Sequence, residues 1–305
     1  MIDDLADRLR DPAVVLWLDL DSPSQAELDA VAGQLGLHPL AVEAAAGHER
    51  PKVLHFGTHC VVTACGVRLD PVSGVLVTVG LTAFVTDRAL ITVHHNGITD
   101  IDALVERWDT TADLAKSGAG FLLHGLLDYL VDGHFDAAQA LDEQIEALED
   151  LVFAEDPDDT LLQRRSLTLR KSLNRLRHVV LPIREVVGSV LRRDLQGPQD
   201  PLLPYYQDVL DHVLRVSEWT ESLREEIATI RETQLSLQGN RLNTIMKKVT
   251  SWAAIIAVPT AITGFYGQNL PYPGFAQTWG AWMSTVAIVV LSGVLYVLFK
   301  RRDWL

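Results

Sequence analysis

The chain has 305 residues, with 40 acidic and 26 basic side chains and a formal net charge of −14. The charge is unevenly distributed: from residue 240 onward there are six basic residues and one acidic residue, a net of +5, which leaves −19 on residues 1–239. Such an acidic part argues against nucleic acid as a partner, because phosphate neutralisation requires a basic surface. Its field attracts divalent cations, although solubility alone also accounts for acidity. The only cysteines, Cys60 and Cys65, lack the two-pair spacing of a structural zinc site and indicate a reducing compartment.

The first hundred residues have the pattern of a small α/β domain. Residues 14–20, 53–67, 75–85 and 90–94 are rich in strand-forming residues and predict strands. After the first of these, Ser22 in the N-cap position, Pro23 at the first helical position and Gln25 at the third predict a helix. His94 and His95 are the one adjacent histidine pair, but neighbours on a strand face opposite ways, which argues against a shared metal ion. We therefore expect an α/β domain over residues 1–99.

From residue 100 onward the pattern predicts helices only. Residues 141–152 repeat apolar residues opposite an acidic face, and residues 162–187 repeat them opposite a basic face. With Pro157 at the turn, these segments predict an antiparallel hairpin with complementary charge, inside a helical domain over residues 100–203. After Pro204 no proline occurs until Pro259, which predicts one nearly continuous helix over residues 205–265. Its soluble half, a stalk over residues 204–248, has an apolar stripe that requires neighbouring copies or a surrounding sheath.

The segment from Val249 to Phe299 contains no Asp, Glu, Lys, Arg or His. Its two apolar runs approach the roughly 20 residues that a helix needs to cross a bilayer, and they predict transmembrane helices over residues 249–266 and 279–299 with an external loop over residues 267–278. Basic residues precede the first run and form the tail 300–305, whereas the loop has none. The positive-inside rule then places both termini in the cytoplasm of a multi-pass protein of the cell (inner or plasma) membrane. The acidic start after Met1 does not match a signal peptide.

Several separated segments carry a family resemblance. Between the two apolar runs the chain reads Tyr266-Gly267-Gln268-Asn269, and residues 243–250 before the first run read Asn-Thr-Ile-Met-Lys-Lys-Val-Thr. Residues 37–43 (Leu-His-Pro-Leu-Ala-Val-Glu) with 50–53, and residues 205–212 (Tyr-Tyr-Gln-Asp-Val-Leu-Asp-His), extend the similarity through the soluble part. In these segments the chain resembles the CorA family of divalent-cation channels over nearly its whole length. The resemblance implies a funnel-shaped homopentamer with an α/β cytoplasmic domain, a long helical stalk and two C-terminal transmembrane helices, of which the first lines the pore.

The resemblance also implies roles for three sets of residues. The selectivity filter at the outer mouth comprises Tyr266, Gly267, Gln268 and Asn269. Amide and backbone carbonyl oxygens there can accept hydrogen bonds from the water shell that Mg²⁺ releases reluctantly. The pore-lining face of the first span comprises Asn243, Met246, Val249, Thr250, Ala253 and Ala257, whose small and apolar members also suit close helix packing. The carboxylates expected to bind regulatory Mg²⁺ between subunits, or else to form a solvated face, are Asp208, Asp211 and Glu232.

The predicted function is a membrane channel for divalent cations, with Mg²⁺ as the first choice and Co²⁺ or Ni²⁺ as further substrates, gated by cytoplasmic Mg²⁺. Family members usually have methionine, or in a zinc-transporting branch an aliphatic residue, where this chain has Gln268. A proton-coupled Zn²⁺ transporter of the same fold is therefore the alternative. Ala44 also replaces an aspartate common in the family, and the external loop lacks the usual acidic residue. A membrane-anchored helical scaffold would not explain the polar turn, and the sequence has no phosphate-binding loop, nucleophile elbow or two-histidine metal motif of an enzyme.

Overall fold

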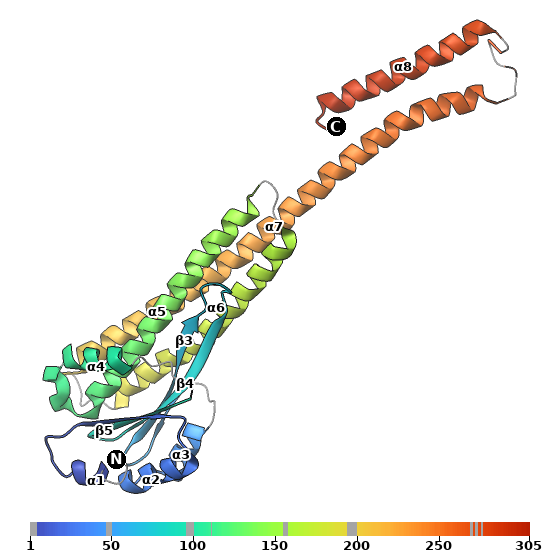
Figure 1. Cartoon of the computed structure of the whole chain (residues 1–305). Helices are drawn as coiled ribbons and strands as arrows, with labels where there is room; N and C mark the ends of the chain where they lie inside the picture. Colours follow the sequence, from blue (N-terminus) through green and yellow to red (C-terminus); the bar gives the residue numbers. More distant parts are fainter. Residues whose placement is uncertain are drawn as a thin grey trace. The chain divides into compact units, whose positions relative to one another are not determined.

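The computed structural model describes residues 5–46, 51–95, 101–110, 112–154, 158–193, 200–268, 271, 274–275 and 277–305. The chain divides into two compact units, Met1–Ile230 and Arg231–Leu305. The first unit contains a β-sheet, the helices α1 to α6 and the beginning of α7, and the second contains the rest of α7 and the helix α8 (Figure 1).

Five strands form one mixed sheet in the first unit. They are β1 (Leu16–Asp21), β2 (Lys52–His55), β3 (Cys60–Leu69), β4 (Leu76–Val85) and β5 (Ala89–His94), in the order β1-β5-β4-β3-β2. β1 is parallel to β5, and the other neighbours are antiparallel. The predicted single strand over residues 53–67 is wrong: β2 and β3 form a hairpin, in which the Phe56 amide donates to the His59 carbonyl at 2.8 Å. The apolar run continues through this reversal, so its composition does not reveal the turn.

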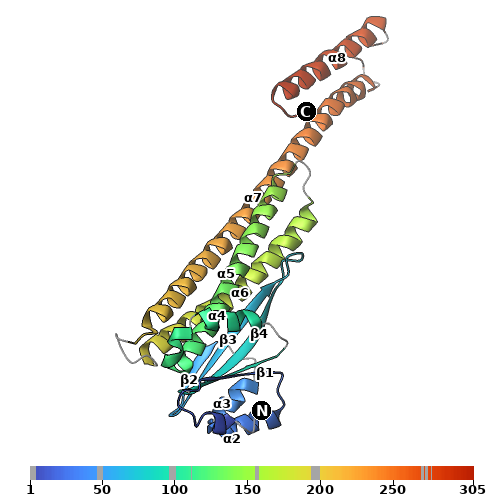
Figure 2. The ribbon, with the colours of Figure 1, turned by 60° about the vertical axis from the view of Figure 1, so that its left-hand side comes forward.

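The helices α1 (Leu5–Arg8), α2 (Gln25–Leu35) and α3 (Pro39–Ala46) cover one face of the sheet near the N-terminus (Figure 2). Leu18 of β1 and Ile91 and Val93 of β5 share a core with Leu28 and Val31 of α2. Alternation along the strands sends these residues to the α2 face, and it sends Trp17, Asp19 and Thr92 to the other.

The N-cap of α2 is Ser24 rather than the predicted Ser22. The Ser24 side chain accepts from the Glu27 amide, and the Glu27 carboxylate accepts from the Ser24 amide at 2.8 Å, which completes a capping box. The Ser22 amide instead donates to the His94 carbonyl at 2.7 Å, so Ser22 extends the pairing of β1 with β5. The prediction was wrong because a strand partner that is remote in sequence holds Ser22.

The other face of the sheet carries a layer of helices: α4 (Ile101–Thr110), the 3₁₀ helix η2 (Ala112–Ser117), α5 (Ala119–Val152) and α6 (Asp159–Arg193). In both views α5 and α6 lie side by side with the beginning of α7 (Leu203–Tyr266) (Figures 1 and 2). The apolar stripes of α5 and α6 are buried. Among the described residues, α6 forms an ion pair with α7: Arg177 Nε lies 3.2 Å from Glu221 Oε2.

Buried polar contacts join the helical layer to the sheet. The Ser172 hydroxyl of α6 donates to the Gly74 carbonyl at 2.7 Å and accepts from the Leu76 amide at 3.0 Å. His134 Nε2 of α5 lies 2.8 Å from the Cys65 carbonyl of β3. Because each contact satisfies a strand or hairpin group that would otherwise be buried without a partner, it fixes the register of the helices on the sheet.

A tryptophan on α4 anchors that helix. The Trp108 ring packs edge-on against Trp17 of β1, with ring centroids 4.7 Å apart, and its indole N–H donates to the Leu122 carbonyl of α5 at 3.2 Å. A Cβ atom at position 125 would overlap the Trp108 ring, so Gly125 provides the space for this contact. The anchor holds α4 between the sheet edge and α5.

The second unit contains the two apolar segments. α7 ends at Tyr266 and α8 covers Thr278–Arg301, and both helices are long and apolar enough to cross a membrane. The predicted continuous helix over residues 205–265 is confirmed, since α7 begins two residues earlier and ends one residue later. Among the described residues no strand follows β5, as predicted. After α8, the Trp304 ring stacks on Phe299 with centroids 5.7 Å apart.

Burial lowers the pKa of His134 to about 4, more than its hydrogen bond to the Cys65 carbonyl raises it. The unfolded chain takes up this proton near pH 6.5 and the folded chain only near pH 4, so the stability of the first unit falls as the pH drops between these values. A shift of this size corresponds to about 3 kcal/mol. We expect thermal unfolding of the detergent-purified protein to show this loss, and His134→Gln to reduce its dependence on pH. His178→Gln, at an exposed position on α6, is the control, and equal pH slopes in the two variants would contradict the assignment.

Candidate functional site

The pore-lining candidates all lie on α7 in the second unit. At about 100° per residue they occupy a sector about 120° wide, and all six side chains are exposed in this chain, with Met246 at 62% and Val249 at 59%. Ser251, on another side of the helix, is fully buried, and its hydroxyl donates to the Lys247 carbonyl at 2.8 Å. The predicted pore face is therefore a surface that this chain does not cover by itself.

The polar turn begins where α7 ends. The Gly267 amide donates to the Thr263 carbonyl at 2.8 Å, and the Gln268 amide donates to the Phe265 carbonyl at 3.3 Å. A Cβ atom on Gly267 would lie 2.9 Å from the Thr263 oxygen, closer than real Cβ contacts, so glycine is required for this approach. Tyr266 packs edge-on against Phe265, and Gln268 is exposed. Asn269, the fourth predicted filter residue, lies outside the described residues.

The predicted regulatory carboxylates lie on α7 in both units. Asp208 and Asp211 are exposed in the first unit, and Glu232 is exposed in the second. Asp208 is close enough to His124 of α5 for its charge to favour the protonated imidazole, although burial is the larger effect and lowers the pKa of His124. Among the described residues of one chain, none of these three carboxylates belongs to a group of three or more potential metal ligands.

A different cluster, which the sequence did not predict, lies between α4, α5 and α7. Among the described residues, the one group of three potential metal ligands is Asp128, Asp132 and His212, whose ligand atoms lie within 4.8 Å of one another. Arg107 of α4 pairs with Asp128 Oδ2 and, at 2.6 Å, with Asp132 Oδ2. Asp132 and His212 also line a cavity of about 510 Å³ with Tyr129 and other residues of α5 and α7.

Charge balance in this cluster comes from Arg107. Burial lowers the pKa of the Arg107 guanidinium, but its hydrogen bonds and attraction to Asp132 and Asp128 outweigh burial and raise that pKa above its ordinary value. Two carboxylates and an imidazole suit a divalent cation, and here a guanidinium pairs with both carboxylates and offsets one of their two negative charges. The spacing of Asp128 and Asp132 places them on one helix face, but Arg107 and His212 come from distant parts of the sequence.

The two long apolar helices and the polar turn between them define an integral membrane protein with a large soluble unit. The family model described as "CorA-like Mg2+ transporter protein" matches residues 12–301, so the chain belongs to this family. It is a divalent-cation transporter of the membrane and not an enzyme.

Relatives extend over nearly the whole chain. The "Cobalt/magnesium transport protein CorA" of Thermotoga maritima is 28% identical over 97% of this chain and 85% of its own length. The "Zinc transport protein ZntB" of Pectobacterium atrosepticum is 25% identical over 95% of this chain and 88% of its own length. The solved CorA magnesium transporter from Methanocaldococcus jannaschii has a TM-score of 0.79 at 24% identity, covering 95% of this chain and 91% of the other, and so shares the fold.

Substitution of Arg107 tests whether its guanidinium balances the charge of the Asp128 and Asp132 carboxylates. We expect Arg107→Ala to lower the stability of the first unit by about 1–3 kcal/mol, because two half-buried carboxylates lose their charged partner. Millimolar Mg²⁺ should restore part of the loss in the variant and have a smaller effect on the unchanged protein. Thermal unfolding with and without Mg²⁺ measures both effects. Arg164→Ala, on the exposed face of α6, is the control. Equal Mg²⁺ responses in the two variants would contradict the role of Arg107 in balancing the charge of Asp128 and Asp132.

Proposed function

We propose that the protein is a homopentameric channel that conducts hydrated Mg²⁺ into the cytoplasm. The carrying observation is the neutral turn Tyr266-Gly267-Gln268 at the end of α7, within a segment from Val249 to Phe299 that has no Asp, Glu, Lys, Arg or His. In a divalent-cation transporter, the ion must cross this segment with neutral ligands only. Five copies of the exposed face of α7 would then surround the pore, with both termini in the cytoplasm.

A neutral filter suits a cation that keeps its water shell. The inner-shell waters of Mg²⁺ are strong hydrogen-bond donors, and amide and carbonyl oxygens accept these bonds without competing for the metal itself. Asn269 from each subunit would supply one oxygen to a ring of side-chain oxygens. Gly267 lets the backbone pass close to the Thr263 carbonyl as it leaves α7. Asn243, the one amide on the pore face, would hold a second hydrated ion near the cytoplasmic entrance, and the apolar positions between would close by dewetting.

The alternative substrate is Zn²⁺, with proton coupling. It is favoured by the similarity to a zinc transport protein and by Gln268, which stands in the filter where magnesium channels of the family usually have methionine. Flux into liposomes that contain the purified protein, measured for Mg²⁺, Co²⁺, Ni²⁺ and Zn²⁺ with and without a pH gradient, separates the two functions. Mg²⁺ flux that is independent of the gradient supports the channel, and Zn²⁺ flux that requires the gradient refutes it.

For gating, we propose that intracellular Mg²⁺ binds between neighbouring subunits at Asp208 and Asp211 and, farther along α7, at Glu232. Without metal these carboxylates repel one another across the interface, where charges about 4 Å apart interact by several kcal/mol at an effective dielectric constant near 20. Mg²⁺ would bind the closed state more tightly than the open state and so stabilise it. Loss of Mg²⁺ would then shift the equilibrium toward the open pore.

Asn269→Ala should abolish cation flux and leave the oligomer intact, since it removes the proposed ring of side-chain oxygens and leaves the sequences of α7 and α8 unchanged. Flux into liposomes and size-exclusion chromatography measure the two properties. Asn240→Ala, which deletes an exposed amide of α7 outside the pore face, should transport normally. Normal flux through an assembled Asn269→Ala protein would exclude this turn as the filter.

Gln268→Met tests the residue in which the chain differs from the usual signature of its family. We expect flux to persist and the ratio of Mg²⁺ to Zn²⁺ flux to rise, because the substitution introduces the residue that magnesium channels of the family usually have and keeps the side-chain length. The liposome assay with both ions measures the ratio. If the ratio does not change, the Gln268 side chain does not face the ion.

The double substitution Asp208→Asn and Asp211→Asn should shift inhibition of the current to higher internal Mg²⁺ and make protease protection of the first unit less dependent on Mg²⁺. The reason is that two metal-binding charges are lost without a change in side-chain size. Glu218→Gln with Glu225→Gln, two exposed carboxylates of the same helix, is the matched control. Unchanged inhibition and protection would mean that Asp208 and Asp211 form only a solvated face.

A further inference from the structure

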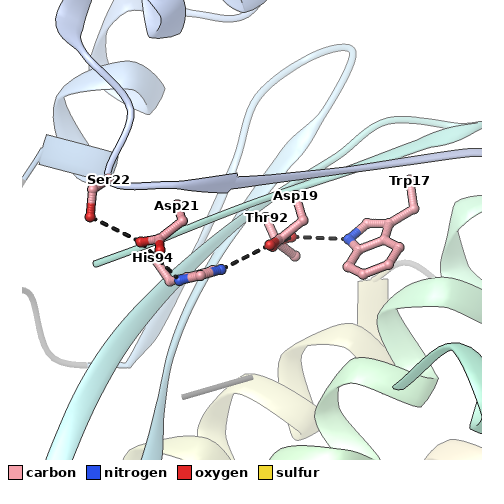
Figure 3. Close-up of polar contacts among 6 residues, drawn as sticks. All are labelled: Trp17, Asp19, Asp21, Ser22, Thr92 and His94. Carbon is pink, nitrogen blue, oxygen red and sulfur yellow. Dashed lines mark hydrogen bonds and ion pairs between the residues drawn. The ribbon is translucent and has the colours of Figure 1, made fainter. Parts of the chain in front are cut away.

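His94 lies at the end of β5, directly opposite Asp21 in the parallel pairing with β1. Its side chain is 5% exposed and lies between two carboxylates, with Nε2 2.9 Å from Asp19 Oδ2 and Nδ1 3.6 Å from Asp21 Oδ1. Figure 3 shows the six residues of this row, from the indole of Trp17 to the hydroxyl of Ser22. Nothing in the transport mechanism uses them.

The hydrogen bonds of the row can be assigned a direction. The indole N–H of Trp17 can only donate, and it donates to Thr92 Oγ1 at 3.0 Å. The Thr92 hydroxyl must then use its own proton toward Asp19 Oδ1, with which it is hydrogen-bonded. The other oxygen of the Asp19 carboxylate accepts from His94 Nε2. The row therefore places the imidazole proton on Nε2, and in the neutral ring Nδ1 keeps a lone pair.

That lone pair faces another acceptor. His94 Nδ1 is buried and has no hydrogen-bond partner in the part of the chain that the structure describes. Asp21 Oδ1, its nearest polar neighbour, already accepts from the Ser22 hydroxyl at 2.9 Å. The separation of 3.6 Å exceeds the length of an N–H···O hydrogen bond. Two acceptors that face each other at this distance repel, and a cation between them, either a metal ion or the proton of an imidazolium, removes the repulsion.

We propose that His94 Nδ1 and the Asp21 carboxylate bind a first-row transition-metal dication such as Zn²⁺ or Co²⁺, with water completing the coordination. Two ligands each about 2.0–2.2 Å from one ion, at an angle of about 110–120°, lie about 3.4–3.6 Å apart, which matches the observed separation. Asp19 has the position of the outer carboxylate that orients a metal-bound histidine through its second nitrogen. Thr92 and Trp17 hold Asp19 in turn.

The ligand chemistry separates this site from the transport path. Imidazole nitrogen favours Zn²⁺, Co²⁺ or Ni²⁺, whereas Mg²⁺ prefers oxygen ligands only. Asp21 is 58% exposed on its side chain, so the site is open to solvent at the end of the edge strand. The soluble unit thus has a place where a transition metal binds in the presence of Mg²⁺, and this inference stands whichever ion the pore conducts.

Counting bound metal tests the site. The full-length protein in detergent, stripped of metal, is dialysed against Zn²⁺ in excess Mg²⁺, and bound Zn²⁺ is determined per chain. Asp21→Asn removes one ligand at an exposed position, and Asp29→Asn, an exposed carboxylate on α2, is the matched control. All other metal-binding groups, including Asp128, Asp132 and His212, are the same in both variants. We expect Asp21→Asn to bind one Zn²⁺ fewer than the control and the unchanged protein.

Two further measurements identify the ligands. His94→Gln should lose the same Zn²⁺, and Co²⁺ in its place should give a visible absorption band in the control that is missing in both ligand variants. Thr92→Val keeps both ligands but releases Asp19, so the Zn²⁺ affinity should fall about 10–100-fold without loss of the site. An equal Zn²⁺ count in Asp21→Asn and Asp29→Asn, with circular dichroism showing both folded, would overturn the proposal. So would a His94 that binds protons alone, seen as a pH-dependent imidazole signal that Zn²⁺ does not alter.

Discussion

The rest of the molecule depends on one constraint: from Val249 to Phe299 the chain has no Asp, Glu, Lys, Arg or His. A bilayer core penalises uncompensated charge and unsatisfied backbone groups, so the two apolar segments are helices and the polar turn lies between them. A divalent cation that crosses this region meets amides, hydroxyls and carbonyls only. Neutral oxygens cannot replace the hydration of Mg²⁺ at low cost, which is why a filter of this composition favours a hydrated ion. The carboxylates are consequently concentrated before the first apolar segment, where residues 1–239 carry a net charge of −19.

The carboxylates of the soluble unit lie in two kinds of environment. On exposed positions of α7, Asp208 and Asp211 remain available to other chains or to ions. Between α4, α5 and α7, Arg107 is held against Asp128 and Asp132 and offsets one of their two negative charges within the chain. The guanidinium is part of the chain, so no free ion has to lose translational entropy to supply this positive charge. The packing of α4 on α5 therefore does not require a bound metal. The same helix is anchored by Trp108 against β1 and α5, which keeps Arg107 in reach of both carboxylates.

Two clusters with different ligand chemistry lie in this unit. Asp128, Asp132 and His212 already have a cationic neighbour, whereas His94 and Asp21 face each other without one in the described part of the chain. The row of hydrogen bonds from Trp17 through Thr92 and Asp19 fixes the tautomer of His94 on the face of the sheet that the helical layer covers. Stability and metal chemistry are therefore linked at the β1–β5 edge, because the same residues that pair the strands orient the imidazole.

The sequence by itself determined the features that depend on local spacing and composition. α7 was predicted to within two residues at each end, because Pro204 marks its start and the helical pattern continues through Pro259, which lies inside the helix. Hydropathy alone located the two apolar helices. Tertiary structure decided what depends on partners remote in the chain: Ser22 pairs with His94 instead of capping α2, one apolar run folds back as β2 and β3, and Arg107 meets Asp128 and Asp132. His94 ends β5, and the carboxylates that flank it come from β1, more than seventy residues earlier. Side chains that meet across elements are set by sheet pairing and helix packing, and no local pattern encodes them.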